Sequence, residues 1–349
     1  MRLDRRTLLG LLAAPMVARA RPRPARADPP WLRREGSAFG TRLELESPAQ
    51  GAQAAEVEQA LEAAHQEVER IHVLLSGTTP GSDVSRINAA AGSASVEVSA
   101  ETFALVRRCL ELSELSGGVF DVTYASMSRL WTFDSAPGAA ALPDPEEVAR
   151  LRKLVDYRLV VLDEARTAVM LPSAQMRLGL GGIARGYALD RAARLLLGGG
   201  ASTFRATLGG LRLCHGPQGP GGWPVGVPDP RAPDRVFASV ELRDGACATL
   251  GDYERFVLVG GRRYHPVIDP RTGFPARASR AVTVLAPRAL DADWLGKACF
   301  ILGPKDAAPV LARVAGAQAL WVTRDNAVEM TDGMKRRVKL GGKPTDGEP

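Results

Sequence analysis

A glycine-rich segment in the middle of the chain has the residue types that bind phosphate groups. Residues 178–187 read LGLGGIARGY, with Gly181 and Gly182 directly before the start of a predicted helix. Glycines let the main chain come close to a diphosphate, and a helix N-terminus adds partial positive charge. Arg185, in the first turn, can pair with phosphate oxygens. The spacing differs from the dinucleotide-binding and Walker A motifs, and a glycine pair before a helix is also common in ordinary turns.

A second segment, residues 265–275 (HPVIDPRTGFP), predicts a rigid loop at the exit of a β-hairpin. Two turn-forming pairs, which begin at Asp269 and Thr272, leave the side chain of Arg271 projecting from the loop. A loop this constrained either carries part of a site or serves as a stiff corner.

Thr249, Asp252 and Tyr253 stand close together in a third segment, residues 248–255 (ATLGDYER), which lies just before the same hairpin. Their hydroxyl and carboxylate groups are suited to contacting a polar ligand. The alternative is an ordinary turn with a surface ion pair.

Asp293 and Lys297 form the fourth candidate, because a spacing of four residues puts both on one face of a predicted helix. As a surface ion pair they contribute only about 0.3–0.5 kcal/mol. As part of a site, the carboxylate lies beside a bound diphosphate, where it holds a metal ion or acts as a base.

The elements that position these segments follow from apolar spacing and helix caps. Apolar residues from Val57 to Leu75 recur every three or four positions, which predicts an amphipathic helix. Ser99 is a good N-cap for a helix that ends at Ser116, and glycines at 198–200 end another that begins near Ile183. Further helices are expected at 291–302 and 306–315, strands at 37–47, 158–163, 168–171, 175–180, 204–208, 211–214, 223–227, 236–242, 255–260, 263–268, 282–285 and 320–323, a polar loop at 76–92 and a surface insertion at 134–148.

This order has helices early, strands late and no regular β-α-β alternation. It predicts an α+β fold with a mostly antiparallel sheet and packed helices, rather than a doubly wound nucleotide-binding fold.

The net charge of +6 in 349 residues comes from the first 27 residues, which hold seven arginines and one aspartate. The remainder has 38 basic residues (45 − 7) and 38 acidic residues (39 − 1), so it is neutral. A neutral body with few aromatic residues argues against a nucleic-acid partner.

The same leader predicts export. Arg5 and Arg6 precede an apolar run from Leu8 to Ala18, and small residues near Ala27 form a cleavage pattern. Paired arginines before a short apolar region are typical of a twin-arginine signal, and the run is too short to span a bilayer. A membrane anchor or a basic tail is the alternative. We therefore expect a periplasmic protein without a transmembrane span in its mature chain, tethered to the inner membrane if the leader is retained.

The four cysteines, Cys109, Cys214, Cys247 and Cys299, lie far apart without a C-x-x-C pair. This spacing excludes the common zinc and redox motifs. Buried free thiols and a disulfide both remain open.

The four segments, in this order, resemble those of the ApbE-type FAD:protein FMN transferases. The resemblance covers about residues 36–335 and gains specificity from further motifs at 39–41 (FGT), 82–88 (SDVSRIN), 118–123 (GVFDVT), 208–210 (LGG) and 223–227 (WPVGV). It divides the chain into a signal at 1–27, a flavin transferase domain at 28–335 and a disordered tail at 336–349.

The resemblance implies an ApbE-type fold and a reaction in which FMN passes from FAD to a threonine or serine hydroxyl of an acceptor protein, with release of AMP. It implies a magnesium ion held by the main-chain oxygen of Ala184 and by Asp293. Asp293 and Asp269 are the catalytic candidates. The FAD-binding candidates are Gly181, Gly182, Arg185, Thr249, Asp252, Tyr253, Arg271, Thr272 and Lys297. The expected partner is a flavoprotein subunit of a membrane or periplasmic redox complex.

The chain departs from the family pattern at informative positions. Lys297 stands where the family has a threonine that binds the metal, and Pro266 stands where it has a histidine. Gly179 replaces a common aspartate. The departures put metal binding and turnover in question, so a non-catalytic FAD-binding accessory protein is the alternative function, and an exported structural domain without ligand is a third.

Overall fold

The computed structural model describes residues 30–347 apart from 52, 134–141 and 219–221. The predicted export signal and the first part of the predicted insertion at 134–148 lie outside these described residues. Within them, no helix is long and apolar enough to span a bilayer.

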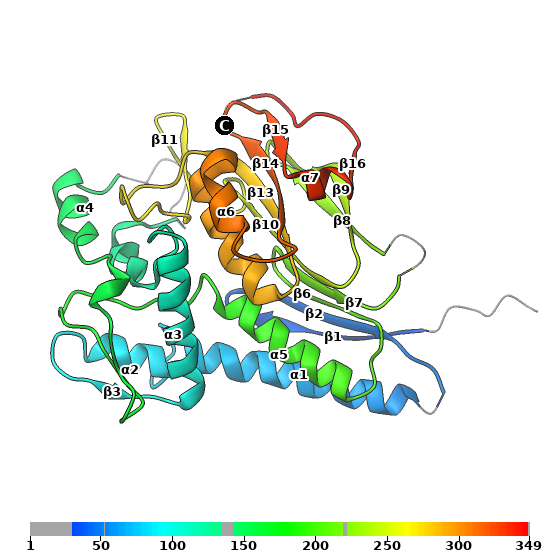
Figure 1. Cartoon of the computed structure of the whole chain (residues 1–349), viewed down its shortest axis with the longest axis horizontal. Coiled ribbons are helices and arrows are strands. Elements are labelled where there is room, and N and C mark those ends of the chain that lie inside the picture. The colour runs from blue at the N-terminus through cyan, green and yellow to red at the C-terminus, as the bar shows by residue number, and fades with distance from the viewer. Residues whose placement is uncertain (1–29, 52, 134–141, 219–221, 348–349) are drawn as a thin grey trace, which may run out of the picture.

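An eight-stranded sheet forms the centre of the molecule (Figure 1). Its neighbouring strands all run antiparallel. In spatial order they are β1 (Trp31–Ala38), β2 (Thr41–Pro48), β6 (Phe204–Leu208), β7 (Leu211–His215), β10 (Gly245–Gly251), β13 (Ser279–Ala286), β14 (Gln318–Thr323) and β15 (Val328–Met330). Every residue of β13 is buried, as expected for a central strand covered on both faces.

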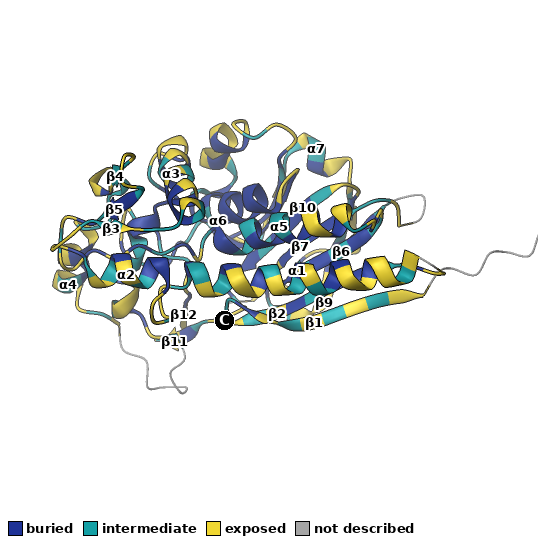
Figure 2. Ribbon diagram, turned by 90° about the horizontal axis from the view of Figure 1, so that it is seen from below, coloured by how far each residue is buried: buried dark blue, intermediate teal, exposed yellow. Residues whose placement is uncertain are grey.

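Three long helices cover one face of the sheet: α1 (Gln53–Leu75), α5 (Ala184–Gly198) and α6 (Ala289–Leu311). Figure 2 shows buried and exposed residues alternating along α1. The buried set of α1 includes Val57, Leu61 and Val68, so the predicted amphipathic helix is confirmed. Helix α6 is interrupted at Gly303, whose φ of 74° is left-handed, which matches the two shorter helices predicted there.

A small sheet packs on the other face. It contains β8 (Trp223–Asp229), β9 (Ala232–Leu242) and β16 (Val338–Leu340). Trp223 and Phe237 from this sheet form one apolar cluster with Leu285 and Val322 of the main sheet. Helices on one face and strands on the other give the predicted α+β architecture.

Further elements surround one end of the main sheet. They are α2 (Asp83–Ala89), β3 (Val96–Glu97), α3 (Ala100–Leu115), the 3-10 helices η1 (Val122–Leu130) and η2 (Tyr157–Leu159), α4 (Pro145–Arg152), β4 (Val161–Asp163), β5 (Ala168–Met170) and the hairpin of β11 (Val257–Val259) and β12 (Arg262–Tyr264). The Ser99 hydroxyl caps α3 by accepting from Thr102 N–H, as predicted.

Several local predictions are wrong. The single strand predicted at 37–47 is a hairpin, because Phe39 and Gly40 adopt positive φ values of 54° and 71° and turn the chain. Residues 76–92 contain helix α2, and residues 175–180 form no strand.

The C-terminal segment also differs from its prediction. Residues 338–340 pair with β9, and Thr345 donates its main-chain N–H (2.8 Å) and its hydroxyl (2.7 Å) to Asp229. Asp229 is fully buried and needs such donors, so the predicted disorder is wrong for residues 338–347.

Candidate functional site

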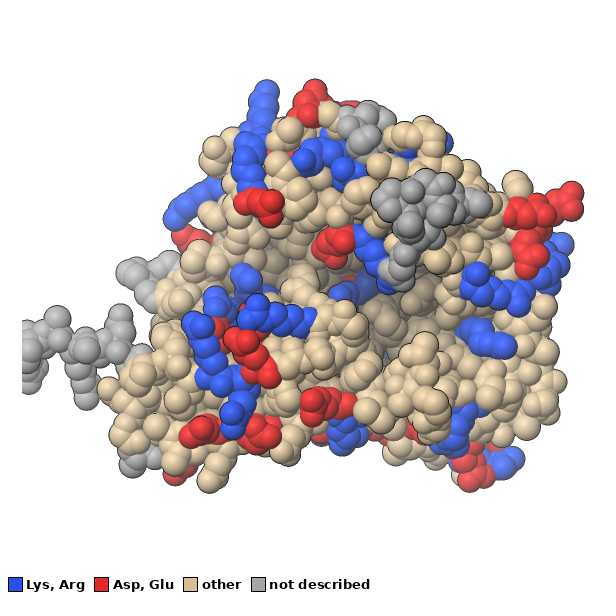
Figure 3. Space-filling model, turned by 180° about the vertical axis from the view of Figure 1, so that it is seen from behind, with Lys and Arg blue, Asp and Glu red and all other residues tan. Residues whose placement is uncertain are grey.

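A cavity of about 250 Å³, here called the first cavity, opens where α5, α6 and η1 meet the ends of β10 and β12. A larger hollow of about 760 Å³ adjoins it and shares Tyr124, Gly181, Arg185 and Pro266 in its lining. Figure 3 shows one face of the molecule hollowed near its centre, with Lys or Arg side chains at the margin of the hollow. The lining of the first cavity includes Gly181, Gly182, Arg185 and Lys297, which the sequence predicted.

The glycine-rich loop is held close to η1 and its preceding residues. A Cβ atom added to Gly182 would lie 3.0 Å from Phe120 Cε2, and one added to Gly181 would lie 3.4 Å from the Tyr124 hydroxyl. At Gly179 an added Cβ would lie 2.8 Å from Ala125 Cβ. The neighbouring side chains therefore fill the space that an aspartate at position 179 would need.

Helices α5 and α6 cross closely beside this loop. A Cβ atom on Gly186 would overlap the main chain of Ala289 and lie 2.6 Å from Leu290 Cα. Asp190 of α5 caps α6 by accepting from Ala289 N–H (2.8 Å) and Leu290 N–H (3.0 Å). This crossing brings Arg185 of α5 next to Asp293 of α6.

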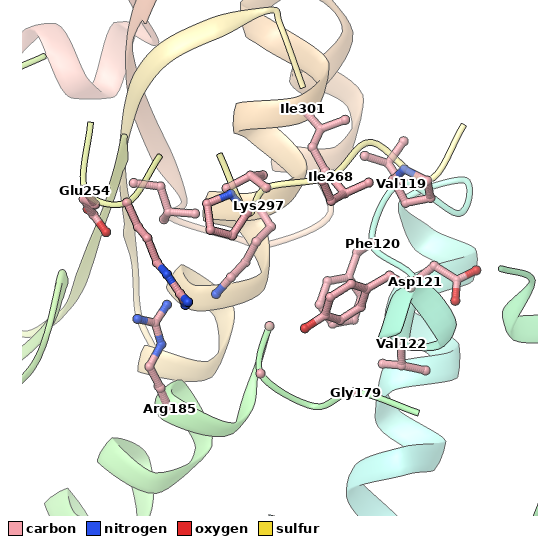
Figure 4. Close-up of a pocket in the computed structure, with 18 of the residues that line it drawn as sticks. Val119, Phe120, Asp121, Val122, Gly179, Arg185, Glu254, Ile268, Lys297 and Ile301 are labelled. Carbon is pink, nitrogen blue, oxygen red and sulfur yellow. The ribbon is translucent and has the colours of Figure 1, made fainter. Parts of the chain in front are cut away.

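Asp293 is fully buried and accepts hydrogen bonds from three donors. Its Oδ1 atom accepts from Lys297 Nζ and from Arg185 Nη2 (3.2 Å), and its Oδ2 atom accepts from the main-chain N–H of Gly186 (3.1 Å). Figure 4 shows Arg185 and Lys297 approaching the same space from their two helices, with Phe120 and Ile268 across the cavity. One carboxylate thus holds two cations at the cavity wall.

Burial shapes the electrostatics of the cavity. It lowers the pKa of Lys297 to about 8, although the attraction of Asp293 acts in the opposite direction. Burial also raises the pKa of Glu254, against the lowering effect of Arg185 and Lys297, even though the residue as a whole is exposed at the rim. The pKa of the Tyr124 hydroxyl is raised for the same reason.

The residues around Asp293 do not fit a divalent cation. Both carboxylate oxygens already accept hydrogen bonds, and one donor is the ammonium of Lys297, which cannot ligate a metal. Ala184, the predicted main-chain ligand, opens α5 and lines the adjoining hollow. In the part of the chain that the structure describes, no three His, Cys, Asp or Glu side chains group as metal ligands.

Other predicted residues lie away from the first cavity. Asp252 accepts from Arg231 at 2.7 and 3.0 Å, and the Thr249 hydroxyl lies 3.0 Å from that of Thr283. Tyr253 packs against the apolar cluster beneath the small sheet.

The predicted loop residues pair with each other. The carboxylate of Asp269 accepts from Arg271, with 2.8 Å between Oδ2 and Nη2, and Thr272 is exposed beside them. The neighbouring Pro266, Ile268 and Pro270 line the first cavity instead. The structure does not bring Asp269, Arg271 or Thr272 together with Arg185 and Lys297, and their roles stay predictions.

Phe120, Tyr124 and Glu254 line the first cavity and were not predicted as site residues. Phe120 lies in the GVFDVT motif and Glu254 in the ATLGDYER segment, so a signal existed for both. Tyr124 directly follows the first of these motifs.

The four cysteines are all buried and free, which settles the alternative in favour of thiols in this structure. Burial raises the pKa of each thiol, with the largest effects at Cys109 and Cys299. They contribute no group to the first cavity.

Comparisons with known proteins agree with this geometry. A model of the ApbE family matches residues 39–321. The FAD:protein FMN transferase of Treponema pallidum (strain Nichols) is 36% identical over 305 residues, which are 82% of this chain and 83% of that protein.

Solved structures give the same result. The crystal structure of the ApbE protein from Thermotoga maritima superposes with a TM-score of 0.80 at 34% identity and covers 88% of this chain and 99% of that one. Pseudomonas stutzeri flavinyl transferase ApbE, in its apo form, superposes with a TM-score of 0.72 at 25% identity, over 90% and 98% of the two chains.

Proposed function

The chain belongs to the ApbE family, and we propose that it transfers FMN from FAD to a threonine or serine hydroxyl of an acceptor protein and releases AMP. The observation that carries the proposal is the pair of cations, Arg185 and Lys297, at a glycine-rich helix start that faces an apolar wall. A ligand with an aromatic ring system and a diphosphate matches both halves of such a cavity.

The diphosphate and the ring system of FAD each have a suitable counterpart. Gly181 and Gly182 let the main chain come close to the diphosphate, and the N-terminus of α5 adds partial positive charge. The main-chain N–H groups of Ala184 and Gly186 already donate to Leu180 O and to Asp293. Phe120, Ile268 and Ile301 offer apolar surface to a ring.

The chemistry of the transfer is a displacement at phosphorus. The acceptor hydroxyl oxygen forms a bond to the phosphorus of the FMN part, and the bond from that phosphorus to the bridging oxygen breaks. AMP leaves with the bridging oxygen, and the hydroxyl proton passes to a base. Arg185 and Lys297 stabilise the negative charge that spreads over the phosphoryl oxygens.

Glu254 is the group we assign to receive the hydroxyl proton. It lines the first cavity, and its raised pKa brings it nearer to the range in which a carboxylate accepts a proton efficiently. Pro266 occupies the position of the family's histidine and has no group that accepts a proton.

We further propose that the reaction proceeds without magnesium at Asp293. The ammonium of Lys297 supplies positive charge where the family pattern has a metal ligand, and Asp293 positions that ammonium and the Arg185 guanidinium. The buried carboxylate then contributes to the reaction by positioning these two cations and does not bind a metal ion.

The leader supports a proposed place of action. Paired arginines before a short apolar run suit a protein exported in its folded state, so we assign the chain to the periplasm, with the inner membrane as the alternative if the leader is retained. The acceptor is then a flavoprotein subunit of a membrane or periplasmic redox complex.

The test is mass spectrometry of acceptor domains incubated with FAD and the protein, with bound flavin recorded by absorbance and AMP by chromatography. We expect a mass increase equal to FMN and an equal amount of AMP, both insensitive to a chelator. FAD binding without transfer to any acceptor domain of a panel supports the accessory flavoprotein instead. A protein that binds no flavin contradicts both functions.

A further inference from the structure

A second cavity, here called the arginine cavity, lies on the opposite side of the chain segment that forms the wall of the first. His265 lines the arginine cavity, and the next residue, Pro266, lines the first cavity. The arginine cavity has a volume of about 50 Å³. Its charged lining consists of one aspartate, Asp252, and six arginines: Arg231, Arg262, Arg263, Arg277, Arg280 and Arg324.

The single carboxylate neutralises one of these six cations. Asp252 forms a bidentate ion pair with Arg231, with N–O distances of 2.7 and 3.0 Å. Its Oδ1 atom also lies 3.7 Å from Arg263 Nη1. Among the residues that the structure describes, Arg280, which is 6% exposed, donates to three neutral acceptors: Arg324 O (2.9 Å), Asn326 Oδ1 (3.2 Å) and Gly347 O (3.2 Å). Counted over the described residues that line it, this small space therefore has five positive charges in excess.

Aromatic rings hold two further guanidinium groups in place. Arg263 lies 4.3 Å from the ring centre of Phe256, and Arg277 lies 5.6 Å from that of Tyr264. Burial and then the neighbouring cations lower the pKa of both arginines. Clustered, partly buried cations that lack carboxylate partners are the ones that a bound anion stabilises most.

Among the described residues that line this cavity, three buried polar atoms have no hydrogen-bond partner: His265 Nδ1, Ser279 Oγ and Arg263 Nε. His265 and Ser279 are each only 4% exposed. His265 Nε2 lies 3.0 Å from the oxygen of Ala276, so Nε2 carries the hydrogen. In the neutral ring, Nδ1 is then an acceptor, and the Ser279 hydroxyl is a free donor.

We propose that the arginine cavity binds a phosphate-class oxyanion, either inorganic phosphate or the terminal phosphate of a small phosphomonoester. Guanidinium forks and the Ser279 hydroxyl donate to its oxygens. A phosphate that still carries one proton donates to His265 Nδ1, which a sulfate has no hydrogen to do. The volume admits one phosphoryl group and is far below the several hundred Å³ of nucleotide-sized pockets.

The site is separate from flavin transfer. Of the residues that line the arginine cavity, none lines the first cavity. The proposal therefore stands or falls independently of the transferase activity.

The test is isothermal titration of the full chain with inorganic phosphate at neutral pH, with ionic strength held constant by potassium chloride. We expect one phosphate per chain with a dissociation constant below about 1 mM. The double substitution Arg277→Gln and Arg324→Gln removes charge at the cavity mouth and should weaken binding by about tenfold or more. Ser279→Ala provides a second, smaller change inside the cavity and should weaken binding several-fold if the double variant does not fold.

A matched control removes the same charge elsewhere. Arg194→Gln with Arg313→Gln changes two exposed arginines outside the cavity and should leave phosphate affinity within about twofold. Arg185→Gln should also leave it unchanged, which excludes phosphate binding in the first cavity. Absence of saturable binding, or an equal loss of affinity in the control, overturns the proposal.

Two further ligands identify the source and the chemistry. Glycerol 3-phosphate that binds as well as inorganic phosphate assigns the cavity to a phosphomonoester terminus, and binding of inorganic phosphate alone assigns it to the free ion. Sulfate should bind at least about tenfold more weakly than phosphate, because it cannot donate to His265 Nδ1. Equal binding of sulfate overturns the assignment to phosphate.

Discussion

The first cavity and the arginine cavity lie on two sides of the same chain segment, but they differ in how their cations are paired with carboxylates. In the first, Asp293 pairs with both Arg185 and Lys297, and much of the remaining wall is apolar. In the second, one aspartate faces six arginines. Cations that lack a carboxylate partner are therefore a stronger sign of a bound anion than the number of cations alone.

Alternation along extended chain explains how neighbours reach different cavities. Gly251 and Pro266 line the first cavity. Their sequence neighbours, Asp252 and His265, line the arginine cavity. Successive side chains of an extended segment point to opposite sides. A sequence motif such as ATLGDYER therefore distributes its residues over two sites.

The largest effect should come from Asp293→Ala. Removal of the carboxylate leaves Lys297 and Arg185 without their common partner, so both lose their positions at the diphosphate. Because loss of a single such stabilising donor costs 10²–10³ in rate, we expect FMN transfer to fall by more than about 1,000-fold. The measurement is the initial rate of AMP release.

The matched variant Asp293→Asn keeps the volume and part of the hydrogen bonding. It separates loss of charge from loss of folding, which thermal unfolding records for both variants. Phosphate affinity of the arginine cavity should not change in either. Unaltered AMP release from Asp293→Ala would show that the assigned site is wrong.

The next effect concerns His265 in the arginine cavity. Burial lowers its pKa from 6.5 to about 4, with Asp252 acting to raise it and Arg277 to lower it further. Between pH 6.5 and pH 4, the ring is protonated in the unfolded chain and neutral in the folded chain. Above pH 6.5 the ring is neutral in both and costs no stability. As the pH falls towards 4, protonation of the unfolded chain lowers the free energy of unfolding by up to about 3 kcal/mol.

The variant His265→Gln has no titrating ring, so its unfolding free energy should fall less between pH 7 and pH 4 than that of the unmodified protein. Denaturant unfolding in phosphate-free buffer measures the difference, since carboxylates contribute equally to both proteins. Identical slopes would mean that His265 is not held neutral by the fold.

The sequence predicted the first cavity in part because its key signals are local. The α5 start with Arg185 and the Asp293–Lys297 pair each lie within one helical turn, and helical spacing is readable from a single chain. Strand β10, in contrast, was not among the predicted strands, because its GACATLG run lacks a polar–apolar alternation. It is covered on both sides, where alternation is not required.

The arginine cavity could not be predicted from the sequence. Its arginines come from between residues 231 and 324, from hairpin, loop and strand-end positions that meet only in the folded chain. Nor did spacing indicate that Lys297 and Arg185 share one carboxylate, since α5 and α6 are far apart in sequence. Contacts of this kind depend on the packing of α5 against α6.

A smaller effect should follow from Lys297→Thr, which returns the metal-ligand residue type of the family pattern. Removal of the ammonium leaves Arg185 as the remaining donor to Asp293 Oδ1 and puts a hydroxyl oxygen beside this carboxylate, a better environment for magnesium. We expect magnesium to raise the transfer rate of the variant by about tenfold and that of the unmodified protein by less than about twofold. Tight magnesium binding by the unmodified protein, seen by titration, would contradict the proposed role of Lys297.

Arg271→Ala should have the smallest effect. The Arg271 side chain is 52% exposed and its guanidinium pairs with Asp269 at 2.8 Å, so its removal should cost no more than about 1 kcal/mol of unfolding free energy. Its main-chain contact, the acceptance of a hydrogen bond from Arg152 Nη1 at 3.2 Å, persists in the variant. FMN transfer should therefore stay within about twofold, measured as the rate of AMP release at saturating FAD. A tenfold loss of transfer with unchanged stability would instead return Arg271 to the flavin site, where the sequence placed it, and would mean that its pairing with Asp269 opens when FAD binds.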